Sequence, residues 1–443
     1  MLLVLVLLCV LFSLLTITEQ TSTGSAGAKL LFEQISKEPP SDGRILIVAG
    51  LSEPEKEFAV SLHRLLESAG YRVGELVGNP MQLRAQIAEE VSGPPIQFVA
   101  TTDVTRPVVE NLRDIPIIAY AKILTPPRRH WPTFLLADNL RNVANQITVI
   151  AIIAIGMTMV IITAGIDLSV GSLIALSAVV IAWVAGALGG ADISTLGILV
   201  AALAALVVCG LTGAFSGLMI TAFKIPPFIA TLAMMQVAAG MAYIISQGKP
   251  IYQLPDRFVW LGRGTEPLLD MPIAVILMAL FYFVAWIVME RSVLGRYIYA
   301  VGGNSEAARL AGIRVNRVLL FVYTSCGLLA GLGGIIMASQ LKSGAPTYGL
   351  TYELYVIAAV VVGGTSLSGG EGKIIGTLIG AFIIGVIQNG MNLTNIETYT
   401  QKVVLGLVIL AAVLFDRLKQ KGLTRRLRSS RPDSDNKVEV TSS

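Results

Sequence analysis

Few residues of this chain could do chemistry in an apolar setting, and Asp167 is the first of them. It is the only carboxylate between Asp138 and Asp192. An acid inside an apolar region is costly and often functional, although Asp167 or Ser169 could instead cap the helix that follows. Three more polar residues in apolar segments could line a path for a polar solute or could bond neighbouring helices: Gln236, Asn389 and Asn392.

A second candidate is the run Leu367–Glu371, LSGGE, which looks like the signature of an ATPase subunit. Such a subunit also needs a phosphate loop of the form G-x-x-x-x-G-K-[ST]. The nearby Gly372-Lys373 has Leu367 where the first glycine belongs and Ile374 where Ser or Thr belongs. The run is therefore predicted to be a glycine-rich turn between helices.

Catalytic and metal-binding constellations are not visible in the sequence. The two histidines, His63 and His130, lie outside the apolar core, and the three cysteines lie within apolar segments. Their spacing fits neither a metal site nor a disulfide framework. We therefore expect no enzyme activity, no metal and no cofactor.

These residues are embedded in a chain with the composition of a membrane protein. Of its 443 residues, 54% are hydrophobic and only 14% are charged, against roughly 25% charge in an ordinary soluble domain. Apolar stretches of about 17–25 residues match a hydrocarbon layer of about 30 Å, and backbone groups in lipid must be satisfied within the segment. The predicted fold is an α-helical polytopic membrane protein with about ten transmembrane helices. The expected spans are Met1–Ile17, Val143–Ala164, Ser172–Leu188, Leu196–Thr221, Pro227–Ser246, Met271–Val288, Val318–Ser339, Tyr352–Gly363, Ile374–Gly390 and Val403–Phe415.

Residues 1–17 could be a first transmembrane helix or a cleaved signal peptide. They lack a basic n-region, and the small-residue cleavage site that follows is weak, so an uncleaved helix with its N-terminus inside is predicted. The transmembrane core is expected to span residues 131–415.

Between the first helix and this core lies a stretch with soluble α/β character, residues 42–122. Strands are expected at Arg44–Val48, Tyr71–Val77, Ile96–Ala100 and Ile115–Tyr120, and helices at Pro54–Gly70, Met81–Val91 and Val108–Leu112. Strands that alternate with helices at this spacing predict a parallel sheet with crossover helices.

The distribution of basic residues predicts the orientation of the chain. With the N-terminus inside, the α/β domain is extracytoplasmic and the connection Val288–Asn316 is inside. That connection carries or borders Arg291, Arg296, Arg309, Arg314 and Arg317, as the positive-inside rule requires. The basic tail, residues 416–443, is predicted to be cytoplasmic and disordered. Nucleic-acid binding, the other interpretation of such a tail, is not favoured.

Two loops share the pattern G-x-x-L-S-x-G, at Gly165–Gly171 and Gly364–Gly370. Each joins two apolar segments, and both are placed inside. Same-direction repeats occur in transporters, although so few matching positions could also arise by chance.

The connection Leu294–Ile313 contains a short capped helix. Asn304 or Ser305 can cap a helix that begins at Glu306, and Gly312 can end it after about two turns. Such a helix could lie in a groove of a partner, or it could be an ordinary capped loop.

This connection, together with Ala164–Ser172 and Val361–Gly370, resembles the permease subunits of ribose-type ABC importers. The resemblance runs from about Phe134 to Phe415 and includes Gly376–Ala381 and Asn389–Leu393. It implies that the chain forms the pathway for a sugar such as ribose in a bacterial inner (plasma) membrane. It also implies a coupling helix that docks on a separate ABC ATPase subunit, formed here by Gly303, Asn304, Glu306, Ala307, Arg309 and Gly312.

The same resemblance implies further partners: a second permease copy or paralogue, and an extracytoplasmic solute-binding protein. The insert departs from the family, whose first two helices are joined by a short loop. Its own motifs, Gly50-Leu51-Ser52-x-Pro54 and Ala69-Gly70-Tyr71, resemble one lobe of periplasmic sugar-binding proteins. The second lobe is absent, so the insert could serve docking and spacing or could bind a ligand.

Two other function classes stay open at this point. A secondary transporter is disfavoured because no intramembrane chain of Asp, Glu, His or Lys is visible. A membrane sensor would read a ligand through the outer α/β domain. The sequence does not identify the sugar, and it does not distinguish a homodimer from a heterodimer.

Overall fold

A computed structural model describes residues 1–37, 43–89, 95–252, 254–267 and 270–429. The chain divides into two compact units, each described here by itself. The α/β lobe is Thr16–Thr133, and the helical unit is Met1–Leu15 with Phe134–Ser443.

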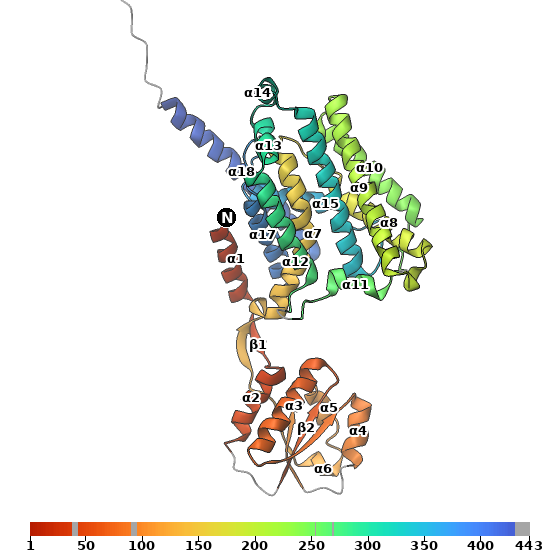
Figure 1. Ribbon diagram of the computed structural model, residues 1–443. Helices are drawn as coiled ribbons and strands as arrows, with labels where there is room; N and C mark the ends of the chain where they lie inside the picture. Colours follow the sequence, from red (N-terminus) through yellow and green to blue (C-terminus); the bar gives the residue numbers. More distant parts are fainter. Residues whose placement is uncertain (38–42, 90–94, 253, 268–269, 430–443) are drawn as a thin grey trace, which may run out of the picture. The chain divides into compact units, whose positions relative to one another are not determined.

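The α/β lobe is built on a parallel sheet of four strands in the order β3-β2-β4-β5 (Figure 1). The strands are β2 (Arg44–Ala49), β3 (Arg72–Val77), β4 (Ile96–Thr101) and β5 (Lys122–Leu124). The helices of the lobe are α2 (Gly24–Ile35), α3 (Glu53–Ser68), α4 (Pro80–Glu89), α5 (Arg106–Glu110) and α6 (Pro116–Ala119).

Apolar side chains of β2 alternate between two separate cores. Ile45 and Ile47 pack with Phe58 and Leu62 of α3, whereas Leu46 packs with Leu83 and Ile87 of α4. A parallel strand covered on both faces reads as a continuous apolar run. This is why the apolar run at Arg44–Val48 predicted the central strand β2.

The predicted strand Ile115–Tyr120 is wrong, because Pro116–Ala119 forms helix α6. Proline lacks the N–H that a central strand must donate, and its fixed φ suits the first turn of a helix. The fourth strand is β5, which begins at Lys122. The lobe also extends beyond the predicted limits 42–122, because it includes α2 and a ribbon of two strands.

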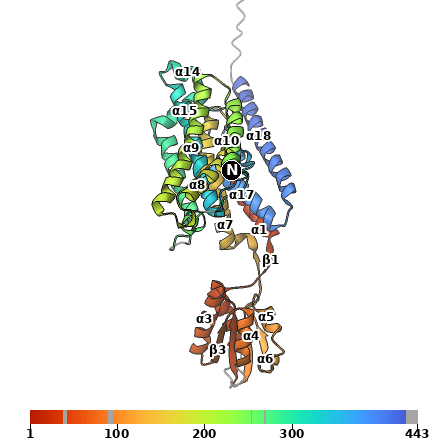
Figure 2. The same ribbon diagram turned by 90° about the vertical axis from the view of Figure 1, so that its right-hand side faces the viewer.

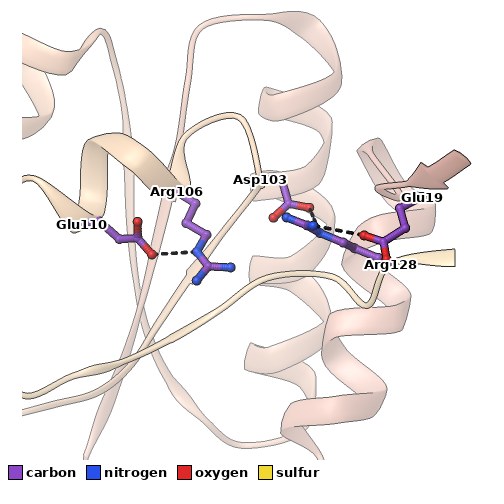
Figure 3. Close-up of polar contacts among 5 residues, drawn as sticks. All are labelled: Glu19, Asp103, Arg106, Glu110 and Arg128. Carbon is purple, nitrogen blue, oxygen red and sulfur yellow. Dashed lines mark hydrogen bonds and ion pairs between the residues drawn. The ribbon is translucent and has the colours of Figure 1, made fainter.

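That ribbon consists of β1 (Ile17–Gln20) and β6 (Arg129–Pro132), which pair antiparallel. Arg128, next to β6, lies between Glu19 of β1 and Asp103 of the loop after β4, at 3.2 and 3.4 Å (Figure 3). Hydrogen bonds from its guanidinium raise the pKa of Arg128; the bond to Asp103 contributes most, followed by the bond to Glu19. A separate pair, Arg106 and Glu110 at 2.8 Å, lies within α5.

Among its described residues, the helical unit contains seven helices that are long and apolar enough to cross a membrane (Figures 1 and 2). They are α7 (Ala137–Ile162), α8 (Val170–Ala187), α9 (Thr195–Ala222), α10 (Pro227–Ser246), α12 (Ile273–Trp286) extended by a π turn (Ile287–Arg291), α15 (Val315–Leu341) and α17 (Ile374–Leu393). Shorter elements are two 3-10 turns (Thr133–Leu135, Gly190–Asp192), α11 (Asp256–Arg263), α13 (Val293–Gly303) and α14 (Ser305–Leu310).

Three of the ten expected spans are shorter apolar helices. They are α1 (Leu2–Leu15), α16 (Tyr352–Val362) and the apolar part of α18, Thr398–Leu414. At 1.5 Å per residue, the 11 residues of α16 reach only about half of a 30 Å hydrocarbon layer. The count of ten full spans therefore stays a prediction.

Helix α15 lies at the centre of the helical unit, against α7, α8 and α9. Gly327 lies against the backbone of Gly213 on α9, and Cys326 lies against Gly156 on α7. Small residues at such positions allow close approach, which drives helix association in lipid.

The predicted disorder of the tail needs a correction for its first part, because α18 spans Thr398–Ser429. Leu, Lys, Arg and Gln dominate residues 417–428, and all four are strong helix formers. The first proline after them is Pro432. Residues 430–443 lie outside the described part of the chain.

Candidate functional site

The connection between α13 and α14 is shaped by side-chain caps. Ser292 Oγ accepts a hydrogen bond from the amide of Gly295 at 3.1 Å and starts α13. Asn304 Oδ1 accepts one from the amide of Ala307 at 3.0 Å and starts α14. Of the two predicted caps, Asn304 is therefore the one that acts, and Ser305 is the first helical residue.

Gly312 ends this short helix in the left-handed region, with φ +84°. Its amide donates to the carbonyl of Arg309, and the amide of Ile313 donates to the carbonyl of Ala308, both at 3.0 Å. Paired bonds of this kind satisfy the last carbonyls of a helix, and glycine is favoured where they require positive φ.

All six residues predicted for coupling lie together on the exposed side of this segment: Gly303, Asn304, Glu306, Ala307, Arg309 and Gly312. Helix α14 projects at one end of the helical bundle (Figures 1 and 2). Glu306 and Arg309 form an exposed ion pair at 3.5 Å, which contributes little to stability in water.

Leu310 is an exposed apolar residue of α14 that the predicted set omitted. Its side chain is 90% exposed, whereas Ala308 on the same helix is buried. A large apolar residue held outward on a rigid, capped helix is typical of a contact surface. The signal in the sequence was one large apolar side chain in a short helix whose other residues are Ser, Glu, Ala and Arg.

A groove of about 1060 Å³ opens beside α14. Its lining includes four cationic side chains, Lys224, Arg309, Arg314 and Arg317, and one carboxylate, Glu306. The electrostatic character of the groove is therefore positive, and it favours an acidic partner surface.

The second repeat loop, the end of α7 and the end of α13 meet at one place. The amide of Gly370 donates to the carbonyl of Ile162, the last residue of α7, at 2.8 Å. Gly302 lies against the same carbonyl, and Gly303 lies against Gly370. Tyr299 of α13 also donates to the carbonyl of Gly372 at 2.8 Å. The segment that carries α14 thus rests directly on the turns that end α7 and α16.

The LSGGE run is a closed turn, as expected. The amide of Ser366 donates to the carbonyl of Glu371 at 3.0 Å, and Gly369 and Gly370 both have positive φ. Since the amide of Gly370 is already bonded to α7, it is not open to a phosphate.

Asp167 and Ser169, the first candidates for the solute path, are fully buried beside the start of α8. Asp167 Oδ1 accepts hydrogen bonds from the amide of Ser169 at 2.9 Å and from its hydroxyl at 2.6 Å. The geometry supports a structural role for Asp167, which closes the turn that leads into α8, whereas Ser169 makes no side-chain cap bond to that helix.

The other three candidates lie at three different places. Asn389 and Asn139 exchange two hydrogen bonds, at 2.9 and 3.0 Å, that join α17 to α7. Asn392 accepts from Gln401 at 2.8 Å beside a cavity of about 160 Å³. Gln236 lines another cavity, of about 200 Å³, together with Glu353. The structure does not bring the five predicted residues together.

Sequence comparison gives consistent relatives for the helical unit. The family described as "Branched-chain amino acid transport system / permease component" matches residues 139–413. The ribose import permease protein RbsC of Escherichia coli K12 is 46% identical over 293 residues, which cover 65% of this chain and 88% of that protein. RbsC of Bacillus subtilis 168 is 43% identical over 288 residues, covering 65% and 87%.

A relative with another sugar in its name is the L-arabinose transport system permease protein AraH of Escherichia coli K12. It is 39% identical over 290 residues, covering 66% of this chain and 86% of that protein. No solved structure matches the chain. The matched family residues, 139–413, exclude the α/β lobe.

Proposed function

This chain belongs to the family of branched-chain amino acid transport system permease components and is a sugar-importer permease of the ribose type, and we propose that ribose or a closely related small sugar is its solute. The single observation that carries the choice of solute is the 46% identity to a ribose import permease over most of that protein's length. Because an arabinose permease is also 39% identical to this chain, other pentoses must be tested as alternative solutes.

The experiment is uptake by vesicles that contain the permease with its ATPase and binding-protein partners. Radiolabelled ribose is the probe, and unlabelled arabinose and glucose are competitors. We expect ATP-dependent ribose accumulation that unlabelled ribose abolishes. Accumulation without ATP would indicate a secondary transporter and would overturn the assignment.

We infer that α14 and its flanks dock on a separate ATPase subunit. The caps at Asn304 and Gly312 make the segment rigid, the outward Leu310 supplies an apolar contact, and the positive groove supplies charge complementarity. Movement of α14 would reach α7 and α16 through Gly302, Gly303 and Gly370. We thereby assign ATP hydrolysis to the partner subunit. This chain forms the solute pathway, whose helices move in response.

The proposed assembly contains a second permease copy or paralogue and an extracytoplasmic solute-binding protein. The exposed faces of α9 and α10 carry large apolar residues that either lipid or a second permease could cover; examples are Leu203, Leu211, Phe228 and Ile244. With the N-terminus inside, the α/β lobe lies outside and α14 and the tail lie in the cytoplasm.

We propose that the α/β lobe is a docking scaffold and not a sugar receptor. In a parallel sheet, ligands bind at the carboxyl ends of the strands where the strand order reverses, here between β2 and β4. That position is occupied by Glu55, which is buried and accepts hydrogen bonds from the hydroxyls of Thr102 and Thr105. The edge is therefore filled by the lobe's own side chains, which disfavours the sensor alternative.

A further inference from the structure

The segment between α15 and α16 does not leave the helical bundle but returns along α8. Gly344 lies against Ala178 and Ala182, and Gly349 lies against Gly171 and Ile174, without room for a Cβ at either glycine. Since Gly171 and Ala182 are separated by eleven residues of chain, the returning segment covers about 16 Å at 1.5 Å per residue. A non-helical half-crossing therefore precedes the short helix α16, which supplies the other half.

Non-helical backbone at membrane depth is tolerated only where protein encloses it or where it lines a water-filled cavity. Transporters use such helix breaks to form solute sites. In this chain, a cavity of about 200 Å³ lies at the break, bordered by α8, by α10 and by residues 346–353. The break thus has a space beside it that a small molecule could occupy.

Four polar side chains from three helices line this cavity: Ser172 of α8, Gln236 and Tyr243 of α10, and Glu353 of α16. The Glu353 carboxylate reaches toward Gly171, where an added Cβ would overlap its Oε2. Within the described ranges, no ion pair involves Glu353, and the side chains of Gln236 and Tyr243 make no hydrogen bond to another residue. The Glu353 carboxylate accepts a hydrogen bond from its own backbone amide, which leaves it further acceptor positions. It and the side chains of Gln236 and Tyr243 are therefore available to a bound small molecule.

The chemistry of the lining side chains determines which class of solute the cavity can bind. A carboxylate accepts hydrogen bonds, whereas an amide, a hydroxyl and a phenol can both donate and accept. Neither Lys nor Arg is among the lining residues, so an anionic solute has no counter-charge. Neutral molecules with several hydroxyl groups satisfy every one of these side chains.

We propose that this cavity is a transient binding site for a neutral polyhydroxylated solute, with Glu353 accepting hydrogen bonds from its hydroxyls and Gln236 contacting it from α10. The proposal rests on the sugar-permease function and adds the residues that touch the solute. A purely structural Glu353 would only stabilise the first turn of α16. Such a role predicts lower stability but no change in the choice among sugars.

The test uses the complete transporter in proteoliposomes with saturating sugar-loaded binding protein. The variants are Glu353→Gln and Gln236→Leu, and the matched control is Glu397→Gln, an exposed acid outside the cavity. We expect the ribose uptake rate to fall about tenfold in Glu353→Gln, since it loses a hydrogen bond to a charged acceptor. ATP hydrolysis stimulated by the loaded binding protein should remain at the wild-type level.

The uptake rates of 2-, 3- and 5-deoxyribose are measured for each variant. A purely structural role of Glu353 would not change the preference among these sugars. The loss in Glu353→Gln should be smaller for the sugar that lacks the contacted hydroxyl. If both variants match Glu397→Gln for every sugar while the wild type transports ribose, the binding site is refuted and the permease function stands. If the wild type transports none of the sugars, the proposed function itself fails. If Glu353→Gln does not insert into the membrane, the Gln236→Leu variant tests the binding site by the same criteria, because the side chain of Gln236 is exposed.

Discussion

The amide of Gly370 donates its hydrogen bond to the carbonyl of Ile162 at 2.8 Å, and this bond joins the turn after α16 to the end of α7. Gly302 of α13 lies against the same carbonyl. Contacts between main-chain atoms have little freedom to adjust. The three segments are therefore expected to move as one body when α14 is displaced.

Gly302 and Gly303 provide a matched pair of substitutions. A Cβ at position 302 would overlap the Ile162 carbonyl, whereas a Cβ at position 303 would meet nothing within 4 Å. We expect Gly302→Ala to destabilise the permease by about 1–3 kcal/mol through overpacking, and Gly303→Ala to leave it unchanged. The Tm of each purified variant in detergent measures this difference. Equal Tm values for the two variants would contradict the close approach.

Gly312 is expected to be essential for coupling because of its φ of +84°. In Gly312→Val, the left-handed conformation costs at least about 1–2 kcal/mol, so the end of α14 should rearrange. Solute-stimulated ATP hydrolysis by the assembled complex should be lost while the permease still inserts. Gly406→Val on α18, also in open space, is the control. Normal stimulated hydrolysis in Gly312→Val would show that α14 does not couple.

Leu310 is expected to act only in the complex. Because its side chain is 90% exposed, Leu310→Ser should leave the Tm of the isolated permease unchanged. Burial of a leucine at an interface contributes about 1.5–3 kcal/mol, so co-purification with the ATPase should weaken by about tenfold or more. Unchanged co-purification would place the ATPase elsewhere.

The Asn139–Asn389 pair is expected to stabilise the fold and not to contact solute. Substituting either residue by alanine should lower the Tm, and the double variant should cost less than the sum of the two single changes, with a coupling of about 1 kcal/mol. The ribose uptake rate per inserted permease should stay the same. A changed sugar preference in Asn389→Ala would return this residue to the solute path.

The orientation of the chain can be tested with a membrane-impermeant maleimide on intact cells. Ser68→Cys in the α/β lobe should be labelled, and Ser443→Cys in the tail should be labelled only after lysis. The parental chain is its own control, because Cys209 and Cys326 are buried and Cys9 is half-buried. Labelling of the tail in intact cells would reverse the proposed topology.

The sequence predicted best the features that depend on neighbouring residues. The cap at Asn304 and the stop at Gly312 arise from hydrogen bonds within a few residues, so the short helix could be recognised from residue types alone. The Asn139–Asn389 pair spans 250 positions, and no local pattern distinguishes a helix-joining amide from a solute-contacting one. The candidate path residues could therefore be selected for their polarity, but polarity alone did not reveal that they lie at separate places.

The half-crossing before α16 was missed for a related reason. Hydropathy marks Tyr352–Gly363 as apolar, but it does not reveal that the preceding residues return along α8, because that path depends on the small residues Gly344 and Gly349 meeting a partner helix. Glu353 could have been noticed as an acid in the first turn of an unusually short apolar segment. Helix α2 could also have been found, because Ala28, Leu31 and Ile35 follow a helical period.

The β1–β6 ribbon has a consequence for how this architecture can be rebuilt. Ile17 is paired with Pro132, so the chain enters and leaves the lobe at adjacent points. An insertion with neighbouring ends disturbs the host chain little, which is why domains are commonly gained or exchanged at such places. The lobe can thus be exchanged as a unit. Residues 16–133 could be replaced by a short linker or by an unrelated domain whose termini lie close together. The remaining helices would keep their order and direction.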